Sequence, residues 1–191
     1  DMVSLIRALR FDQPLMIVGV SKGGEIGLSV TLEHPEMVSR LLLCSCRVGK
    51  PAMSPYMPER WHENDPAIAA GDWEKAATIC WTHFVAGPKR GPDGRSLALK
   101  EKYWTMQLDA YAKRHSSANE LRLPSLRERL GEVSVPCTVV VGELDYDDLH
   151  ESTDALARGL AAKKVLVENA GHLLPMEQPD RFTAIVREFA R

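Results

Sequence analysis

A serine between two glycines, in the run Gly19-Val20-Ser21-Lys22-Gly23, is the residue of this sequence best placed for covalent chemistry. The pattern Gly-x-Ser-x-Gly is typical of a sharp turn from a buried strand into a helix, a turn that exposes the serine hydroxyl. An apolar run, Leu15–Val18, precedes the motif, and residues 22–33 have the composition of a helix. We therefore predict that Ser21 is a nucleophile and that a glycine on each side relieves the crowding of the turn.

An aspartate and a histidine further along the chain fit the two other roles that a nucleophilic serine requires. A serine hydroxyl is a poor nucleophile near neutral pH, so it needs a general base, and the base needs an orienting carboxylate. Asp145 follows the apolar run Thr138–Val141, and His172 follows Lys164–Glu168. Their order and their places after strands match a Ser–Asp–His triad. We predict that Asp145 orients His172, which in turn activates Ser21.

Each assignment has competitors. The glycines could form a phosphate-binding turn, but the motif lacks the spacing of a P-loop or of a dinucleotide fold. Asp145 is preferred because it lies closer to the strand end than Asp147 and Asp148, although the whole acidic loop could simply be exposed to solvent. The other acids there are Glu143, Asp147 and Asp148, of which the last two could cap the helix expected from about Leu149. The second predicted strand is followed by Cys44-Ser45-Cys46-Arg47, which offers no acid. The histidines other than His172 do not follow a strand and a glycine: His34, His62, His83, His115 and His150.

Short apolar runs alternate with helical patterns in the elements that must position these residues. The predicted strands are Leu15–Val18, Arg40–Cys44, Thr138–Val141 and Lys164–Glu168. The predicted helices of the same region cover residues 2–9, 22–33, 149–160 and 179–189. Buried strands that alternate with helices favour an α/β fold, a parallel sheet with helices on both faces.

A mainly helical insert is expected between the two halves of this core. We predict that residues 1–47 and 132–191 form the core and that residues 48–131 form a helical lid or cap. One face of a lid helix is expected to pack toward the core, through Trp73, Ala76, Cys80 and Phe84. Trp81 lies off that stripe, so it either lines the substrate entrance or packs within the lid.

These motifs resemble those of the α/β-hydrolase superfamily. The run VGVSKGGEIGLSVTLEHPEMVSRLLLCS looks like its nucleophile elbow, and GELDYDDLHESTDALARGL and ENAGHLLPMEQPDRFTAIVREF resemble its acid and histidine segments. The run AAGDWEKAATICWTHFVAGPKRG resembles the lid of a branch related to 3-oxoadipate enol-lactonases and small esterases. The resemblance covers essentially the whole chain and implies an α/β-hydrolase fold with a helical lid. It does not specify the substrate.

The resemblance implies a serine hydrolase of small esters or lactones, without cofactor or metal. Ser21 would attack the carbonyl to form an acyl-enzyme, and His172 would move the proton. Asp145 would hold the histidine tautomer. The backbone N–H of Lys22 would be one oxyanion-hole donor, while its side chain points to solvent. Carbon–carbon bond hydrolases and perhydrolases share such a triad and stay open, whereas epoxide hydrolases and haloalkane dehalogenases use an aspartate nucleophile and are disfavoured.

The chain departs from this resemblance at its start. Similar proteins carry several strands and a second oxyanion loop before the elbow, whereas Ser21 lies near the first residue here. We expect a C-terminal portion of a longer hydrolase, with N-terminal strands absent, or a short protein completed by a partner. An unpaired edge at Leu15–Val18 is expected to cause self-association, and the isolated chain to be nearly inactive on p-nitrophenyl esters. The alternative function is a truncated or non-catalytic binding protein of this fold.

Composition narrows the expected partners. A net charge of −2 and 26% charged residues in 191 do not indicate a nucleic-acid or anionic membrane partner. No apolar run approaches the roughly 20 residues of a membrane helix, and the first residues do not form a secretory signal. The pair Cys44-x-Cys46 is too closely spaced for a usual zinc site. A cytoplasmic location is therefore expected.

Overall fold

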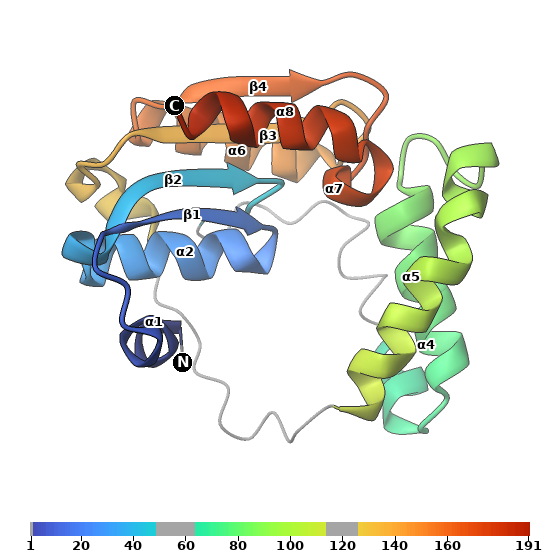
Figure 1. Cartoon of the computed structure of the whole chain (residues 1–191). Coiled ribbons are helices and arrows are strands. Elements are labelled where there is room, and N and C mark those ends of the chain that lie inside the picture. Colours follow the sequence, from blue (N-terminus) through green and yellow to red (C-terminus); the bar gives the residue numbers. More distant parts are fainter. Residues whose placement is uncertain (1, 49–63, 114–125) are drawn as a thin grey trace.

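The core of this computed structural model is a four-stranded parallel sheet with strand order β1-β2-β3-β4 (Figure 1). The structure describes residues 2–48, 64–113 and 126–191. The strands are β1 (Leu15–Val20), β2 (Val38–Cys44), β3 (Cys137–Gly142) and β4 (Lys163–Val167). All four predicted strands are therefore found, and the predicted parallel α/β architecture is confirmed.

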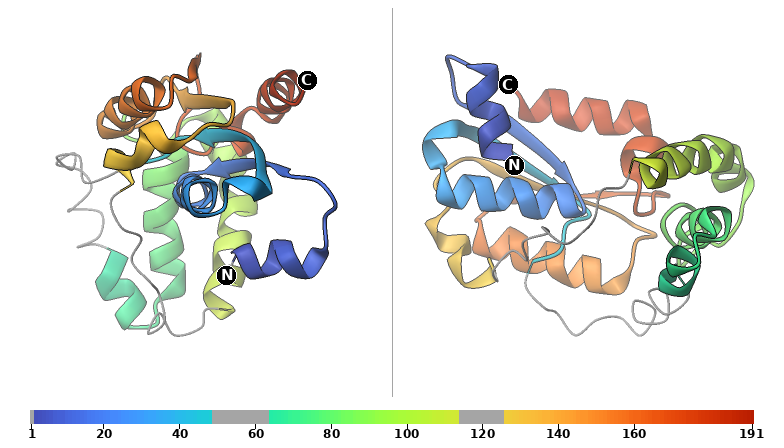
Figure 2. Two further views of the ribbon diagram at one scale, coloured as in Figure 1. Left: turned by 90° about the vertical axis from the view of Figure 1, so that its left-hand side faces the viewer. Right: turned by 90° about the horizontal axis from the view of Figure 1, so that it is seen from below.

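Helices cover both faces of the sheet. One face carries α2 (Lys22–Glu33), α6 (Asp147–Gly159) and the 3₁₀ turn η4 (Arg127–Glu132). The other carries α8 (Pro179–Phe189), which lies across the sheet from α2 and α6 in Figure 2. The remaining elements of the core are α1 (Met2–Leu9), η1 (Pro35–Met37) and the short α7 (Leu174–Glu177). The sequence did not predict α7, which is too short to show a helical period.

The middle of the sheet is apolar on both sides because alternate residues of a strand point to opposite faces. Leu41 and Leu43 of β2 pack under α2 and α6, whereas Leu42 and Cys44 pack under α8. All four side chains are buried. This two-sided burial explains why β2 reads as a continuous apolar run.

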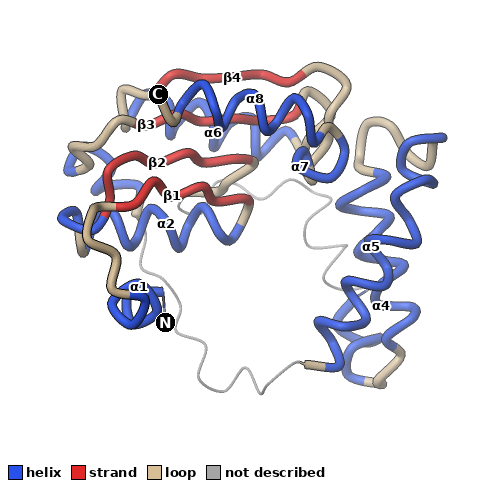
Figure 3. The backbone as a smooth tube through the Cα atoms, in the orientation of Figure 1, coloured by secondary structure: helices blue, strands red, loops and turns tan. Residues whose placement is uncertain are grey.

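Residues 64–113 form the described part of a helical insert, which lies beyond the carboxyl ends of the strands (Figure 3). It contains α4 (Trp73–Trp81), the π-helical turn η2 (Thr82–Ala86) and α5 (Gly94–Ala112). The predicted boundary at residue 48 adjoins residues outside the described ranges, and the predicted boundary at residue 131 lies within the turn η4. The domain boundaries therefore stay predictions.

The buried face of α4 differs from the predicted stripe at one end. Ala76 and Cys80 are buried as expected, but Trp73 is 39% exposed and Trp81 is buried. Trp73 instead lies beside Tyr111 of α5, with ring centroids 5.4 Å apart. The expectation for Trp73 was wrong because α4 packs against its neighbour α5, and a stripe read from one helix does not show where its partner lies.

The two edge strands are unlike each other. Within the described residues, β1 pairs only with β2, and its sequence LMIVGV carries no charge. Strand β4 begins with Lys163 and Lys164, whose charges disfavour pairing with another chain. Near β1, the apolar side chains of Met2, Leu5 and Leu9 on α1 are also exposed.

No helix among residues 2–48, 64–113 and 126–191 is both long and apolar enough to cross a membrane.

Candidate active site

Ser21 lies at the turn between β1 and α2, in a backbone conformation that residues other than glycine rarely adopt. Its φ is 51° and its ψ is −120°. The turn is held by the Ser21 N–H, which donates to the carbonyl of Cys44 at 2.9 Å. Such strained backbone is characteristic of functional turns. The geometry is that of a nucleophile elbow.

Only one of the two flanking glycines is needed for space. A Cβ atom on Gly19 would lie 2.5 Å from the carbonyl oxygen of Gly23 and 2.6 Å from the Gly24 backbone, distances that real structures do not tolerate. A Cβ on Gly23 would meet no described atom within 4 Å. The expectation that both glycines relieve crowding was therefore wrong for Gly23, because its α-carbon faces open space.

Asp145 and His172 form a buried hydrogen-bonded pair. His172 Nδ1 lies 3.1 Å from Asp145 Oδ1 and 3.2 Å from Oδ2, and the two side chains are 5% and 0% exposed. Asp145 Oδ1 also accepts the backbone N–H of Tyr146 at 2.9 Å. Burial by itself would raise the pKa of the Asp145 carboxyl, but His172, the Ser45 hydroxyl and the Tyr146 N–H together hold that pKa below its usual value.

The loops that carry this pair are interlocked at the carboxyl ends of β3 and β4. A Cβ on Gly142 would lie 2.4 Å from the carbonyl oxygens of both Ala170 and Gly171, so the histidine loop passes directly over the end of β3. The Leu144 N–H donates to the Ala170 carbonyl at 2.8 Å. Because this contact directs the loop back across β3, His172 reaches the carboxylate that follows the neighbouring strand.

The third predicted residue, Ser21, shares the same end of the sheet, since β1 and β4 are parallel. The structure brings Asp145 and His172 together but records no hydrogen bond of the Ser21 hydroxyl with any described residue. In ligand-free enzymes such contacts are often long and tighten only when substrate binds. The contact between Ser21 and His172 therefore stays a prediction.

Comparison with known proteins decides the family. The sequence profile described as "Alpha/beta hydrolase family" matches residues 1–185. This chain belongs to the alpha/beta hydrolase family. It is 24% identical over 196 residues to a protein of Bacillus subtilis (strain 168) named as a 2-succinyl-6-hydroxy-2,4-cyclohexadiene-1-carboxylate synthase, covering 99% of this chain and 70% of that protein.

Two solved structures show the same fold. An esterase from Thermogutta terrifontis superposes with a TM-score of 0.78 at 24% identity, covering all of this chain and 70% of the esterase. The enol-lactonase from Burkholderia xenovorans LB400 gives a TM-score of 0.74 at 21% identity, again over all of this chain and 70% of that structure. Both comparisons agree with the parallel sheet and its flanking helices.

Lys22 is the first residue of α2 in this alpha/beta hydrolase. Its backbone N–H therefore lacks an acceptor within the helix, and its role as an oxyanion-hole donor stays a prediction. The side chain is 58% exposed, and its Nζ lies 3.3 Å from Glu25 Oε2. The expectation that the Lys22 side chain points to solvent is confirmed.

The acids near Asp145 have other partners. Asp147 Oδ1 lies 2.7 Å from Lys89 Nζ, and the buried Asp148 pairs with Arg47. Helix α6 begins at Asp147, and its N-cap is Tyr146, which makes no side-chain cap. The expectation that Asp147 or Asp148 caps this helix was therefore wrong, because both lie inside its first turn.

Two further residues, neither of them predicted as part of the site, contact the pair. Ser45 is fully buried after β2 with a φ of 48°, and its hydroxyl helps to hold the pKa of the Asp145 carboxyl below its usual value. The Phe84 ring lies 5.1 Å from the His172 ring, at 32° between planes. Ser45 follows a predicted strand, as the other candidate residues do. Phe84 belongs to the helical stripe that was predicted to pack toward the core, but no local pattern indicated that His172 would be its neighbour.

Trp81 is buried between α4 and α5. Its indole Nε1 donates to the carbonyl of Ser96 at 3.1 Å, and Lys100 Nζ lies 4.8 Å from the ring centroid. This placement favours the packing role over the entrance role of the two that the sequence left open.

The cysteines make no disulfide. Cys44, Cys46, Cys80 and Cys137 are free, and burial raises the pKa of the Cys44 thiol to about 12. Thiols that ionise so weakly are poor nucleophiles and metal ligands. Across the described residues, no three His, Cys, Asp or Glu side chains are grouped as a metal ion would require.

Proposed function

We propose that the chain is a serine hydrolase that cleaves small carboxylic esters or lactones with Ser21, Asp145 and His172 as its triad. The observation that carries the proposal is the buried Asp145–His172 pair at the end of the sheet where Ser21 occupies a strained turn. A buried carboxylate on Nδ1 leaves Nε2 of the imidazole as the proton acceptor. That arrangement suits general-base activation of a hydroxyl.

The proposed reaction has two steps, acylation of Ser21 and hydrolysis of the acyl-enzyme, and the triad acts in both. Ser21 Oγ attacks the carbonyl carbon while His172 Nε2 takes the hydroxyl proton. The oxyanion accepts a hydrogen bond from the Lys22 N–H, and His172⁺ then protonates the departing alkoxide. Water attacks the acyl-enzyme by the same route and releases the acid. Asp145 stays ionised and stabilises the imidazolium.

The names of the similar structures support this reaction class, since one is an esterase and another an enol-lactonase. The Bacillus subtilis protein is named as a synthase and not as a hydrolase. An activity assay must therefore identify the reaction products, because loss of substrate alone would not distinguish the two reactions. The proposal needs no metal or cofactor, assigns residues 48–131 to a cap, and places the protein in the cytoplasm without a nucleic-acid or membrane partner. Trp81 is assigned to packing within the cap and not to the substrate site.

A second function is favoured by one observation. Because the Ser21 hydroxyl makes no hydrogen bond to His172, the chain could bind a small molecule without cleaving it. A fluorophosphonate probe separates the two functions, since it reacts only with an activated serine. We expect one label on the chain, at Ser21 by peptide mapping.

The matched variants make the result specific. Ser21→Ala removes the label, His172→Ala slows labelling by about 10³-fold or more, and Ser39→Ala, at an exposed serine, has no effect. Incubation of p-nitrophenyl esters and of a γ-lactone with enough protein to detect slow turnover, followed by product analysis, identifies the substrate class. A folded chain that takes no label would favour the binding function.

A further inference from the structure

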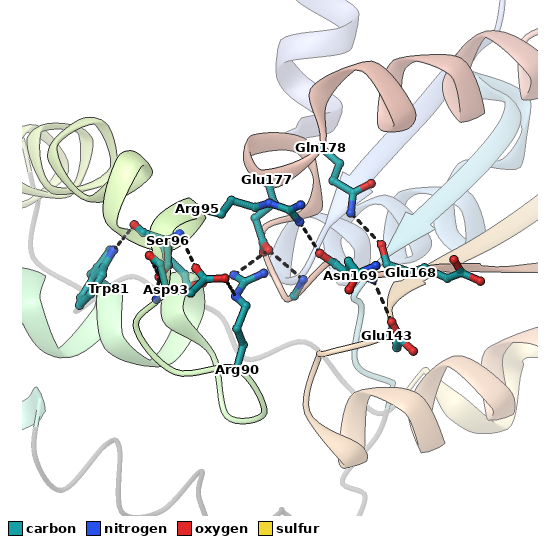
Figure 4. Close-up of polar contacts among 12 residues, drawn as sticks. Trp81, Arg90, Asp93, Arg95, Ser96, Glu143, Glu168, Asn169, Glu177 and Gln178 are labelled. Atoms are coloured by element: carbon teal, nitrogen blue, oxygen red, sulfur yellow. Dashed lines mark hydrogen bonds and ion pairs between the residues drawn. The ribbon is translucent and has the colours of Figure 1, made fainter.

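Glu177 is a buried carboxylate that no step of the proposed reaction uses. It ends α7, which follows the His172 loop, and its side chain is 0% exposed. Its Oε2 accepts the backbone N–H of Gly171 at 3.0 Å and the Arg90 Nη2–H at 2.9 Å (Figure 4). One oxygen thus binds both the residue before His172 and a cation of the helical insert.

Arg90 is the insert's side of this contact. It lies between η2 and α5, and its side chain is 12% exposed. Nη2 also donates to the Val85 carbonyl at 2.8 Å, and Nε lies 3.3 Å from Asp93 Oδ2. Asp93 in turn caps α5 through the Ser96 N–H. Arg90 therefore joins the end of η2 and the start of α5 to Glu177.

Apolar contacts also join the helical insert to the histidine segment. The buried cluster of the insert includes Trp81, Val85 and Tyr103, and Leu173 and Met176 of the histidine segment pack against it. Phe84 of η2 covers the His172 ring. The insert thus contacts His172 itself and the segment that follows it.

Stability alone is a weak reason for an ion pair at this depth. Removing a carboxylate and a guanidinium from water costs free energy that their attraction only partly returns, whereas a pair can hold a defined geometry. The loop is also tightly packed, because a Cβ on Gly171 would lie 3.0 Å from Glu177 Oε1. We propose that Glu177 is a positioning residue. Arg90 of the helical insert binds Glu177, Glu177 fixes the histidine loop, and the docked insert thereby holds His172 against Asp145. The inference rests on the proposed function for the role of His172 as base.

Two matched controls exist in the same network. Glu143 Oε2 accepts the Asn169 N–H at 2.9 Å, so it also binds the histidine loop, but it is exposed and the structure records no arginine on it. Arg95 of the insert donates to the Asn169 carbonyl, also from an exposed position. Figure 4 shows both beside the Arg90–Glu177 contact. Glu143→Ala and Arg95→Ala therefore remove similar bonds without touching Glu177.

Two nuclear magnetic resonance signals of the whole chain report on position independently of turnover. They are hydrogen exchange of the Gly171 amide and the downfield Nδ1–H proton that His172 shares with Asp145. We expect Glu177→Ala and Arg90→Ala to speed Gly171 exchange about tenfold, the equivalent of one hydrogen bond to a charged group. Both variants should broaden the His172 signal. The two controls should leave both signals as in the wild type.

Glu177→Gln keeps an acceptor for the Gly171 N–H but removes the charge that binds Arg90. Adding Arg90→Ala to the Glu177→Gln variant should therefore change neither Gly171 exchange nor the His172 signal further. If Glu177→Ala does not fold, Arg90→Ala and Glu177→Gln still decide the matter. Unchanged signals in folded Arg90→Ala and Glu177→Gln would overturn the positioning role, even if both melt at a lower temperature. A wild type that takes no fluorophosphonate label but whose His172 signal responds to Arg90→Ala would refute the proposed function and leave the positioning role supported.

Discussion

The folded structure stabilises the charged form of the Asp145 carboxyl group. Its pKa lies below the usual value of about 3.9 because donors on His172, Ser45 and Tyr146 outweigh the effect of burial. An unfolded chain would titrate it near the usual value. Since the folded pKa is the lower one, Asp145 contributes stability above about pH 4 that is lost as the pH falls through the folded value.

Replacement of this carboxyl should therefore flatten the acid side of the stability profile. We expect the free energy of unfolding of the wild type, relative to Asp145→Asn, to be greatest near neutral pH and to decrease as the pH falls below about 4. Urea unfolding at a series of pH values measures this difference. Asp12→Asn, at an exposed carboxyl, is the control. A difference that increases on acidification would contradict the lowered pKa.

Gly142 controls the approach of the histidine loop to β3. Any side chain there would lie 2.4 Å from two loop carbonyls, so the loop must move. We expect Gly142→Ala to destabilise the fold by about 1–3 kcal/mol, as overpacking typically does, and to slow fluorophosphonate labelling. Gly131→Ala should change neither property, since a Cβ there meets no atom of the described residues within 4 Å. Equal effects of the two variants would show that the loop tolerates displacement.

At the scale of elements, α6 is attached to the end of β2 by two contacts. Asp148 pairs with Arg47, and the Val48 N–H donates to the Ser152 hydroxyl at 2.8 Å. Asp147, on the same helical turn, pairs with Lys89 at the surface and is 80% exposed. The two adjacent acids should therefore contribute very differently to stability.

We expect Asp148→Ala to cost about 2–3 kcal/mol, less than a fully buried pair because Arg47 keeps 19% of its side chain exposed. Asp147→Ala should cost at most about 1 kcal/mol. Urea unfolding of both variants at neutral pH gives the comparison. Should Asp147→Ala prove the more damaging, the ion pair of Arg47 would not be what attaches α6.

The helices of the insert should depend on Trp81 for their own packing. Trp81 is buried and hydrogen-bonded to Ser96, so Trp81→Ala should destabilise by about 3–5 kcal/mol. Trp73→Ala, at a tryptophan 39% exposed, should cost about 1 kcal/mol. Melting curves together with a panel of ester substrates test this. A changed substrate preference with an unchanged melting temperature would assign Trp81 to the substrate entrance instead.

For the whole molecule, the uncharged edge at β1 is the feature most open to association. We expect the chain to self-associate with increasing concentration through this edge, and Val18→Lys to shift it toward the monomer. Leu166→Lys places the same charge on β4, the edge strand that already carries lysines, and should have no effect. Sedimentation velocity over a concentration series distinguishes them. A wild type that stays monomeric throughout would rule out association at this edge.

Much of the architecture could be predicted because it depends on neighbours along the chain. Apolar runs of strand length located β1 to β4, and helical patterns located α2, α6 and α8. The glycines around Ser21 indicated the turn, and the places of Asp145 and His172 after strands indicated that both would lie at one end of a parallel sheet. These signals are local, since a strand or a turn is specified by residues that are close in sequence.

The contacts that hold this site depend instead on residues far apart in the chain. Phe84 against His172, Arg90 on Glu177 and Arg47 on Asp148 each join segments that no periodicity relates. Local patterns therefore misassigned Asp148 as a helix cap and did not detect Glu177 at all. The sequence alone was sufficient for the parallel sheet and the candidate residues, but only the tertiary structure decided their partners. The physical reason is that the partner of a buried charge is whichever group the packed elements bring within hydrogen-bonding distance.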